Sequence, residues 1–138
     1  MNHWVLVGSS FLFLIPVISF ELYKTNKPIY EYYLAKLLLL TFTMSILFWS
    51  NPIRHGIVHK VDAVVARITS MTLAPYIIFM KLPDIYIGSL FCISAIFLGL
   101  MIYSSNYCSE KEWCSPKHIM CHFMFHIFSV ICIIFAFI

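Results

Sequence analysis

Residues 85–103 have the sequence IYIGSLFCISAIFLGLMIY, an apolar run without a charged side chain. A helix that crosses the hydrocarbon core of a bilayer needs about 20 mostly apolar residues, so this stretch predicts a membrane-spanning helix. Four further stretches have the same character, at residues 4–20, 32–50, 52–74 (with a continuation to 80) and 116–138. The sequence therefore predicts an all-α integral membrane protein, a bundle of about five transmembrane helices.

The composition supports this class. The chain has 138 residues, of which 62% are hydrophobic and only 11% are charged, whereas a soluble domain has about 25% charged residues. The length allows one transmembrane domain, residues 1–138. The net charge is +3 and the basic residues are scattered, which argues against a nucleic-acid partner and leaves the lipid bilayer as the expected surroundings. The first segment lacks a basic start and a small-residue cleavage site, so we expect a retained helix rather than a signal peptide.

Five spans place the second and fourth connections on the same side of the membrane. The predicted helices 52–74 and 116–138 therefore begin on one side and run parallel. Asn51-Pro52 and Ser115-Pro116 predict their first residues, because a small polar cap followed by proline favours a helix start. Basic residues divide almost evenly between the two sides, so the positive-inside rule leaves the orientation, and the membrane concerned, open.

Five of the six histidines fall in these two helices, on stripes with helical spacing. The stripes are His55, His59 and Asp62 on the third helix, and His118, His122 and His126 on the fifth. Ionisable groups inside a bilayer usually face the bundle interior and serve a site. His118 and His55 lie near the membrane surface, so the deeper residues are the stronger candidates.

The depths of the deeper residues match. With a rise of about 1.5 Å per residue, His59 and His122 lie roughly 10 Å from their helix starts, and Asp62 and His126 roughly 15 Å. Ser45 reaches a similar level from the second helix. Three protein ligands and an open water position make a catalytic zinc site. The alternative is that these side chains are polar contacts between helices.

The motifs behind this site are HFMFHIFS, which contains His122 and His126, and HKVDAVVA, which contains Asp62. With Ser45 or Ser50 and His55 before them, they resemble the CREST superfamily of membrane metal-dependent hydrolases. That superfamily includes alkaline ceramidases, adiponectin receptors and GPI-anchor lipid remodelling enzymes. Its pattern is a serine and a histidine near the end of an early helix, an aspartate in the next helix, and His-x-x-x-His in the last helix.

The resemblance implies a Zn²⁺ ion held inside the bilayer by His122 and His126, with His59 or His55 as the first ligand. Asp62 would position or deprotonate the attacking water, and Ser45 would bind the water or the substrate carbonyl. The family usually has seven spans. Asn51, not a serine, stands four residues before His55.

Three functions follow from these observations. The first is an intramembrane zinc-dependent hydrolase that acts on a lipid amide or ester. The second is a small structural or accessory subunit that binds other membrane subunits. The third is a haem-binding redox protein with histidine axial ligands from two helices. Cys108 and Cys114 are either free thiols or a disulfide, according to the side of the membrane on which they lie.

The apolar spans predict that the protein requires detergent or lipid at every step of purification, because their surfaces are insoluble in water. Size-exclusion chromatography with and without detergent measures this. A monodisperse, detergent-free monomer would contradict the membrane assignment.

Overall fold

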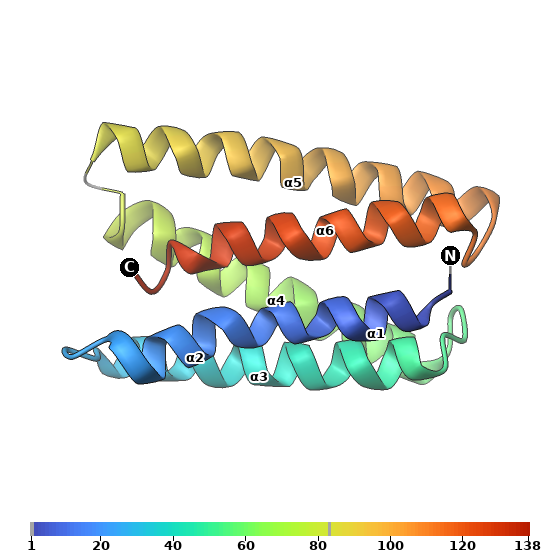
Figure 1. The fold of residues 1–138 in the computed structure, drawn as a ribbon, viewed down its shortest axis with the longest axis horizontal. Helices are drawn as coiled ribbons and strands as arrows, with labels where there is room; N and C mark the ends of the chain where they lie inside the picture. The colour runs from blue at the N-terminus through green and yellow to red at the C-terminus, as the bar shows by residue number, and fades with distance from the viewer. Residues whose placement is uncertain (1, 83) are drawn as a thin grey trace.

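The computed structural model describes residues 2–82 and 84–138, which fold into helices joined by short loops (Figure 1). The elements are α1 (Trp4–Ser10), η1 (Phe11–Phe13), α2 (Leu14–Tyr23), α3 (Ile29–Ser50), α4 (Ile57–Met80), α5 (Ile85–Lys111) and α6 (Pro116–Ile134). α1, η1 and α2 form one continuous span. The described residues contain five spans long and apolar enough to cross a membrane, and no strand. The predicted all-α bundle is therefore confirmed, and it is the architecture of a multi-pass membrane protein.

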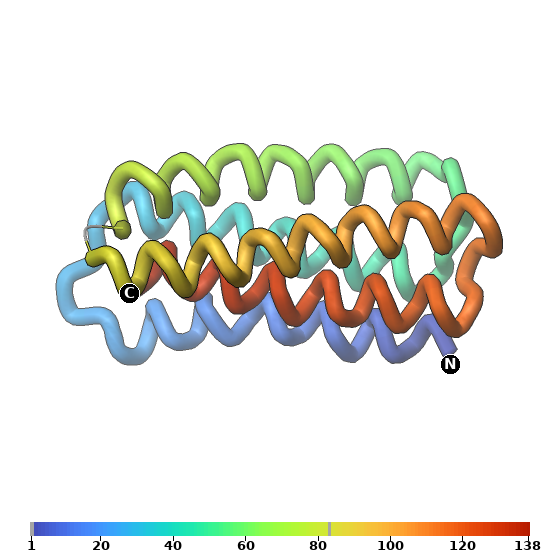
Figure 2. The backbone as a smooth tube through the Cα atoms, turned by 90° about the horizontal axis from the view of Figure 1, so that it is seen from above, coloured from blue at the N-terminus to red at the C-terminus, as the bar shows by residue number. Residues whose placement is uncertain are grey.

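The spans run up and down along one axis, so the bundle has two ends (Figures 1 and 2). We call the end that holds the N-terminal residues and the loops 51–56 and 112–115 the proximal end. The distal end holds the loop 24–28, the connection between α4 and α5, and the last residues of the chain. α1, α4 and α6 all begin at the proximal end, which confirms that the predicted third and fifth helices run parallel.

Two prolines lie inside spans without ending them. Pro16 has no N–H, and its ring crowds the carbonyl group four residues earlier, at Leu12. The chain adopts the tighter 3-10 geometry there, over Phe11–Phe13, and continues as α2 to Tyr23. α4 passes through Pro75 to Met80, so the predicted continuation to residue 80 is confirmed. Membrane helices tolerate such prolines because neighbouring groups satisfy the freed carbonyl.

The predicted start of α4 at Pro52 is wrong. The helix begins at Ile57, after an N-cap at Gly56. The preceding His55 has a φ of 62°, a left-handed conformation that a helix cannot contain. With the later start, His59 lies only about 3 Å and Asp62 about 7.5 Å along α4. The Ser115-Pro116 start of α6 is confirmed, since the Ser115 side chain accepts the N–H of His118. His59 is therefore level with His118, and the predicted match of His59 to His122 and of Asp62 to His126 is lost.

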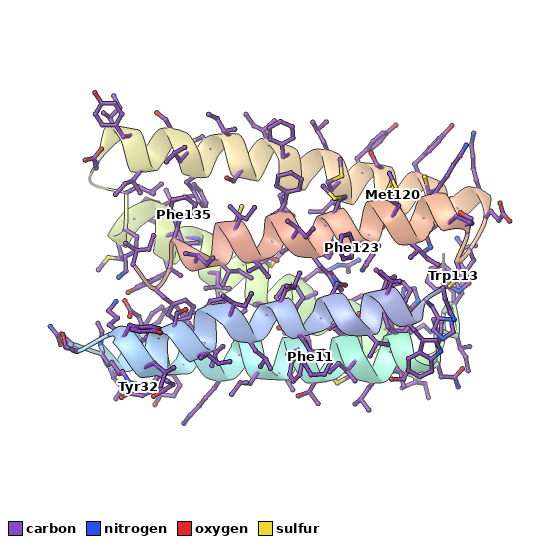
Figure 3. The ribbon with its side chains drawn as sticks, in the orientation of Figure 1. Phe11, Tyr32, Trp113, Met120, Phe123 and Phe135 are labelled. Atoms are coloured by element: carbon purple, nitrogen blue, oxygen red, sulfur yellow. The ribbon has the colours of Figure 1, made fainter. Side chains whose placement is uncertain are left out.

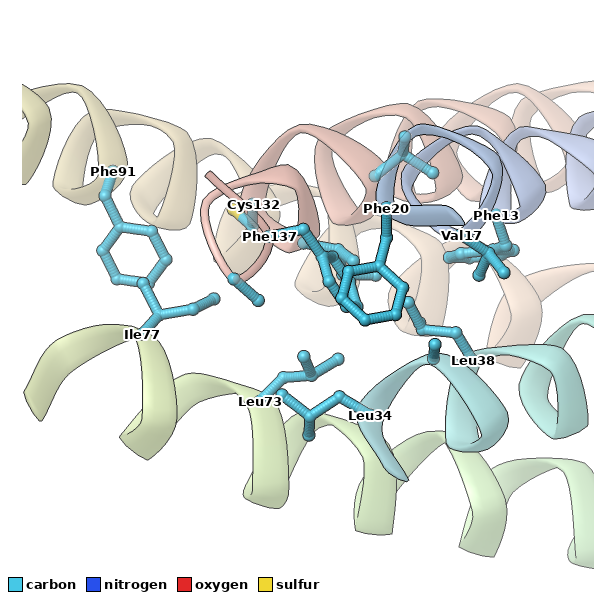
Figure 4. Packing of buried hydrophobic residues seen from close by; sticks show 14 residues of the cluster. Phe13, Val17, Phe20, Leu34, Leu38, Leu73, Ile77, Phe91, Cys132 and Phe137 are labelled. Carbon is cyan, nitrogen blue, oxygen red and sulfur yellow. The ribbon is translucent and has the colours of Figure 1, made fainter. Parts of the chain in front are cut away.

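The apolar core has two parts. The larger cluster lies toward the distal end, where Phe13, Val17 and Phe20 of the first span face Leu34 and Leu38 of α3 (Figure 4). In the same view, Phe91 of α5 points at Ile77 of α4. The smaller cluster lies toward the proximal end and consists of Leu6, Phe48, Trp49 and Ile119. Between these two clusters, along α1 and α6, buried polar side chains take the place of apolar ones.

A buried carboxylate organises the distal end. Glu31, near the start of α3, is 0% exposed. Lys24 Nζ lies 2.6 Å from Glu31 Oε2, and Lys81 Nζ lies 2.7 Å from Glu31 Oε1. The hydroxyl of Tyr76 donates to Glu31 Oε1 at 2.8 Å. Lys81 also donates to the backbone oxygen of Ile138 at 2.9 Å. Partial burial lowers the pKa of Lys24, and Glu31 opposes that shift. One carboxylate therefore ties α3 to the preceding loop, to the end of α4 and to the last residue.

Glu31→Gln should destabilise the protein by about 3 kcal/mol, because it leaves two partly buried ammonium groups without their counter-charge. The matched control is Glu21→Gln. Glu21 pairs with Lys27 at 3.0 Å, but its side chain is 52% exposed, so we expect a loss below about 1 kcal/mol. Thermal unfolding in detergent, followed by tryptophan fluorescence, measures both. Equal losses would show that the Glu31 cluster does not hold the distal end.

Candidate functional site

A cluster of four polar residues lies inside the bundle where α1, α3 and α6 meet. Ser9 Oγ lies 2.7 Å from His126 Nδ1 and joins α1 to α6. Ser10 Oγ lies 2.8 Å from Ser45 Oγ and joins α1 to α3. All four side chains are buried, and we call them the polar centre. It links two predicted site residues, Ser45 and His126, through Ser9 and Ser10, which were not predicted to belong to a site.

The hydrogen bonds of the polar centre allow a tautomer of His126 that can bind a metal. Ser9 Oγ also lies 3.1 Å from the carbonyl oxygen of Leu6, and a hydroxyl has one proton to donate. When Ser9 donates to Leu6, His126 donates to Ser9 through Nδ1, and its Nε2 keeps a free lone pair. Metal-binding histidines commonly have this arrangement, with the second ring nitrogen held by a hydrogen bond. His126 therefore fits its predicted role as a ligand.

His122 lies beside the polar centre, between α5 and α3. Its Nδ1 is 3.0 Å from Ser105 Oγ, and its ring centroid is 5.0 Å from that of His126 and 4.7 Å from that of Trp49. Trp49 is 1% exposed, and its indole N–H has no hydrogen-bond partner among the described residues. On the α3 side, His122 therefore meets a ring that can only donate a hydrogen bond, not a further metal ligand.

His59 and His118 close the first turns of α4 and α6 in the same way. The backbone N–H of His55 donates to His59 Nδ1 at 3.0 Å, and that of Cys114 donates to His118 Nδ1 at 3.2 Å. His55 and Cys114 have φ values of 62° and 57° and directly precede the N-caps. Each histidine thus occupies the position at which a capping box has Glu or Gln. The two helix starts therefore share this capping geometry, although the Asn51-Pro52 and Ser115-Pro116 pairs lie at different positions relative to the caps.

This capping geometry determines the tautomer of both rings. A neutral imidazole whose Nδ1 accepts a hydrogen bond carries its proton on Nε2, so it has no second lone pair to offer a metal. His59 and His118 therefore do not fit a ligand role while the caps are formed. The predicted near-surface position of His118 agrees with this, whereas His59 was predicted to be a ligand.

Trp113 joins the two capped helix starts at the proximal end (Figure 3). Its indole N–H donates to the carbonyl oxygen of Pro52 at 3.1 Å, which links the loop 112–115 to the loop 51–56. The Trp113 ring centroid lies 5.5 Å from that of His59 and 5.0 Å from that of His118. Arg54 Cζ lies 5.7 Å from the same ring, within cation–π range. These contacts form a closed aromatic end to the bundle.

The remaining predicted residues lie apart from the polar centre. Asp62 is half-buried on α4, and in the described part of the chain no hydrogen bond or ion pair joins it to His122 or His126. His55 is exposed in the loop before α4. α4 packs along α3, whereas α6 packs along the first span and α5. Across residues 2–82 and 84–138, no three His, Cys, Asp or Glu side chains gather closely enough to hold a metal ion. As folded, His122 and His126 are two donors without a third.

The five cysteines are free thiols. Cys108 lies near Cys121 across the α5–α6 hairpin. Burial raises the pKa of the Cys114 thiol. Of the two predicted alternatives for Cys108 and Cys114, the structure has the free thiols.

Five residues of the polar centre, of the surroundings of His122 and of the proximal end were not among the predicted site residues. They are Ser9, Ser10, Trp49, Ser105 and Trp113. A serine pair inside an apolar span is a usable signal, because hydroxyl groups in membrane helices often bond to a neighbouring helix. The tryptophans carry no such signal, since their contacts depend on which helices pack together.

No protein-family model, curated protein or solved structure matches this chain. The resemblance to the CREST superfamily therefore stays a hypothesis based on the short motifs.

If His118 is a helix cap, then His118→Gln should keep most of the stability that His118→Ala loses, about 1 kcal/mol. In a capping box, a glutamine oxygen at this position accepts the N–H of the N-cap, which is Ser115 here, next to the Cys114 N–H that His118 accepts. Thermal unfolding of the two variants in detergent measures the difference. Equal destabilisation by Gln and Ala would reject the capping role.

Proposed function

We propose that the chain is a small structural subunit of a larger membrane assembly. The observation that carries the proposal is that each polar pair inside the bundle joins two different helices. The pairs are Ser9–His126, Ser10–Ser45, Thr41–Thr69 and Ser105–His122. Interhelical hydrogen bonds in membranes contribute about 0.6–2 kcal/mol each. Together they link α1 to α6, α1 to α3, α3 to α4 and α5 to α6, so the polar residues account for the bundle's own cohesion.

The exposure of the outer helices supports a role within a larger assembly. In the most apolar stretch of each helix, only 6% of α5 and 22% of α4 is buried inside the bundle, compared with 39% of α3. α4 packs mainly on α3, and α5 mainly on α6. Two of the five spans therefore offer most of their surface to lipid or to neighbouring membrane proteins.

An intramembrane hydrolase acting on a lipid amide or ester is the second candidate. The observation that favours it is the meeting of Ser45, His122 and His126 around one buried polar centre, three of the residues that the family resemblance implies. Zinc at His122 and His126 would require a third ligand. His59 would have to release its cap, or Asp62 would have to move toward α6. The zinc ion and the lipid substrate stay predictions.

One purification separates these candidates. A structural subunit, extracted from its native membrane in polymer-bounded lipid discs, should migrate in a complex well above its own 16.1 kDa and contain no stoichiometric transition metal. A hydrolase should instead be recovered with about one zinc per chain, lost in His122→Ala and His126→Ala but kept in His118→Ala. Native mass spectrometry and elemental analysis measure both quantities. A free chain that carries zinc would overturn the subunit proposal.

A further inference from the structure

α4 exposes a basic stripe on the face opposite its packing face. Thr69, Leu73 and Ile77 are buried and face the bundle. Lys60 and Arg67, seven residues apart, lie on the opposite side of the helix with Val64 and Met71, and all four are exposed. We call these four residues the α4 outer stripe. It places two positive charges where a monomer in a bilayer would contact hydrocarbon.

Arg67 lies too deep for its charge to reach water. α4 is about 36 Å long, and Arg67 is about 15 Å from its first residue, so the side chain starts near the middle of a hydrocarbon core about 30 Å thick. Lys60, about 4.5 Å from the helix start, can extend to the headgroups. A guanidinium near the bilayer centre is costly unless an acidic or polar group meets it.

The described part of the chain supplies no acidic partner for Arg67. It makes no ion pair or side-chain hydrogen bond there, and Glu31 is engaged by Lys24 and Lys81 at the distal end. Asp62 lies five residues before Arg67, about 140° away around the helix. Lys36, the one basic residue of α3, is also exposed.

We propose that the α4 outer stripe docks a transmembrane helix of another subunit that carries a carboxylate near the middle of the bilayer. This inference rests on the proposed structural role and names the surface and the chemistry of the partner. A second copy of the chain is a poor occupant, because it would place a basic stripe against a basic stripe. A lipid phosphate stays at the membrane surface, away from the Arg67 Cα. A carboxylate on a spanning helix meets the guanidinium at its own depth and forms a bidentate pair.

The test uses the full chain reconstituted in phosphatidylcholine vesicles with synthetic transmembrane peptides. One peptide is a leucine-rich helix with a central glutamate and a dansyl label, and its control has leucine in place of the glutamate. Energy transfer from the protein's tryptophans reports association. We expect the glutamate peptide to bind about tenfold more tightly than the leucine peptide. Arg67→Leu should remove that preference, while Arg67→Lys should retain part of it.

Lys36→Leu is the matched control, since it removes an exposed basic residue from α3 and should leave the preference unchanged. Equal binding of the two peptides to the wild-type chain would overturn the proposal. So would a preference that survives Arg67→Leu, or self-association of the chain that Arg67→Leu abolishes. Failure here, with the large native complex still present, would reject this docking surface and leave the subunit role standing. A free chain with bound zinc would reject both.

Discussion

Inside a bilayer, a polar group must find its partner within the protein, because hydrocarbon offers none. This constraint accounts for most of the specific contacts in the fold. Backbone groups are satisfied by helices, and several buried Ser, Thr and His side chains pair with a neighbouring helix, as Ser9 does with His126. Glu31 is a charged example of the same constraint: its buried carboxylate is paired with two lysines and hydrogen-bonded by a tyrosine. Arg67 has no such partner in the described chain, and this is why we propose that a neighbouring subunit supplies one.

The chain reverses direction at both ends of the bundle, and different kinds of contact hold the loops at each end. At the distal end, charge pairs around Glu31 hold the loop 24–28 and the end of α4 together. At the proximal end, histidine caps and the Trp113 ring connect two loops with little charge. Between them, the polar centre lies at the end of α1, at Ser9 and Ser10. There Ser10 links Ser45 of α3 to α1, and Ser9 links His126 of α6 to α1, with His122 next to His126.

The helical class, the number of spans and the parallel course of α4 and α6 were predictable, because the length of an apolar run and the alternation of sides depend on local sequence alone. The Ser115-Pro116 start was predictable for the same reason. The Asn51-Pro52 start failed, although its local signal is as good, because the carbonyl of Pro52 is held by Trp113 from a distant loop. That shift of five residues removed the predicted match in depth of His59 to His122 and of Asp62 to His126. The packing of α4 on α3, and of α6 on the first span and α5, keeps the two pairs apart.

The sequence by itself determined that the chain forms membrane-length helices and that ionisable side chains lie within them, since both properties follow from residue type and helical period. Only the tertiary structure decided which of those side chains meet. Helical spacing places residues on a face, but the neighbour of that face is set by packing between helices far apart in the chain. For this reason His126 contacts a serine of α1, His122 packs against Trp49, and His59 caps α4 instead of lying beside the other two histidines.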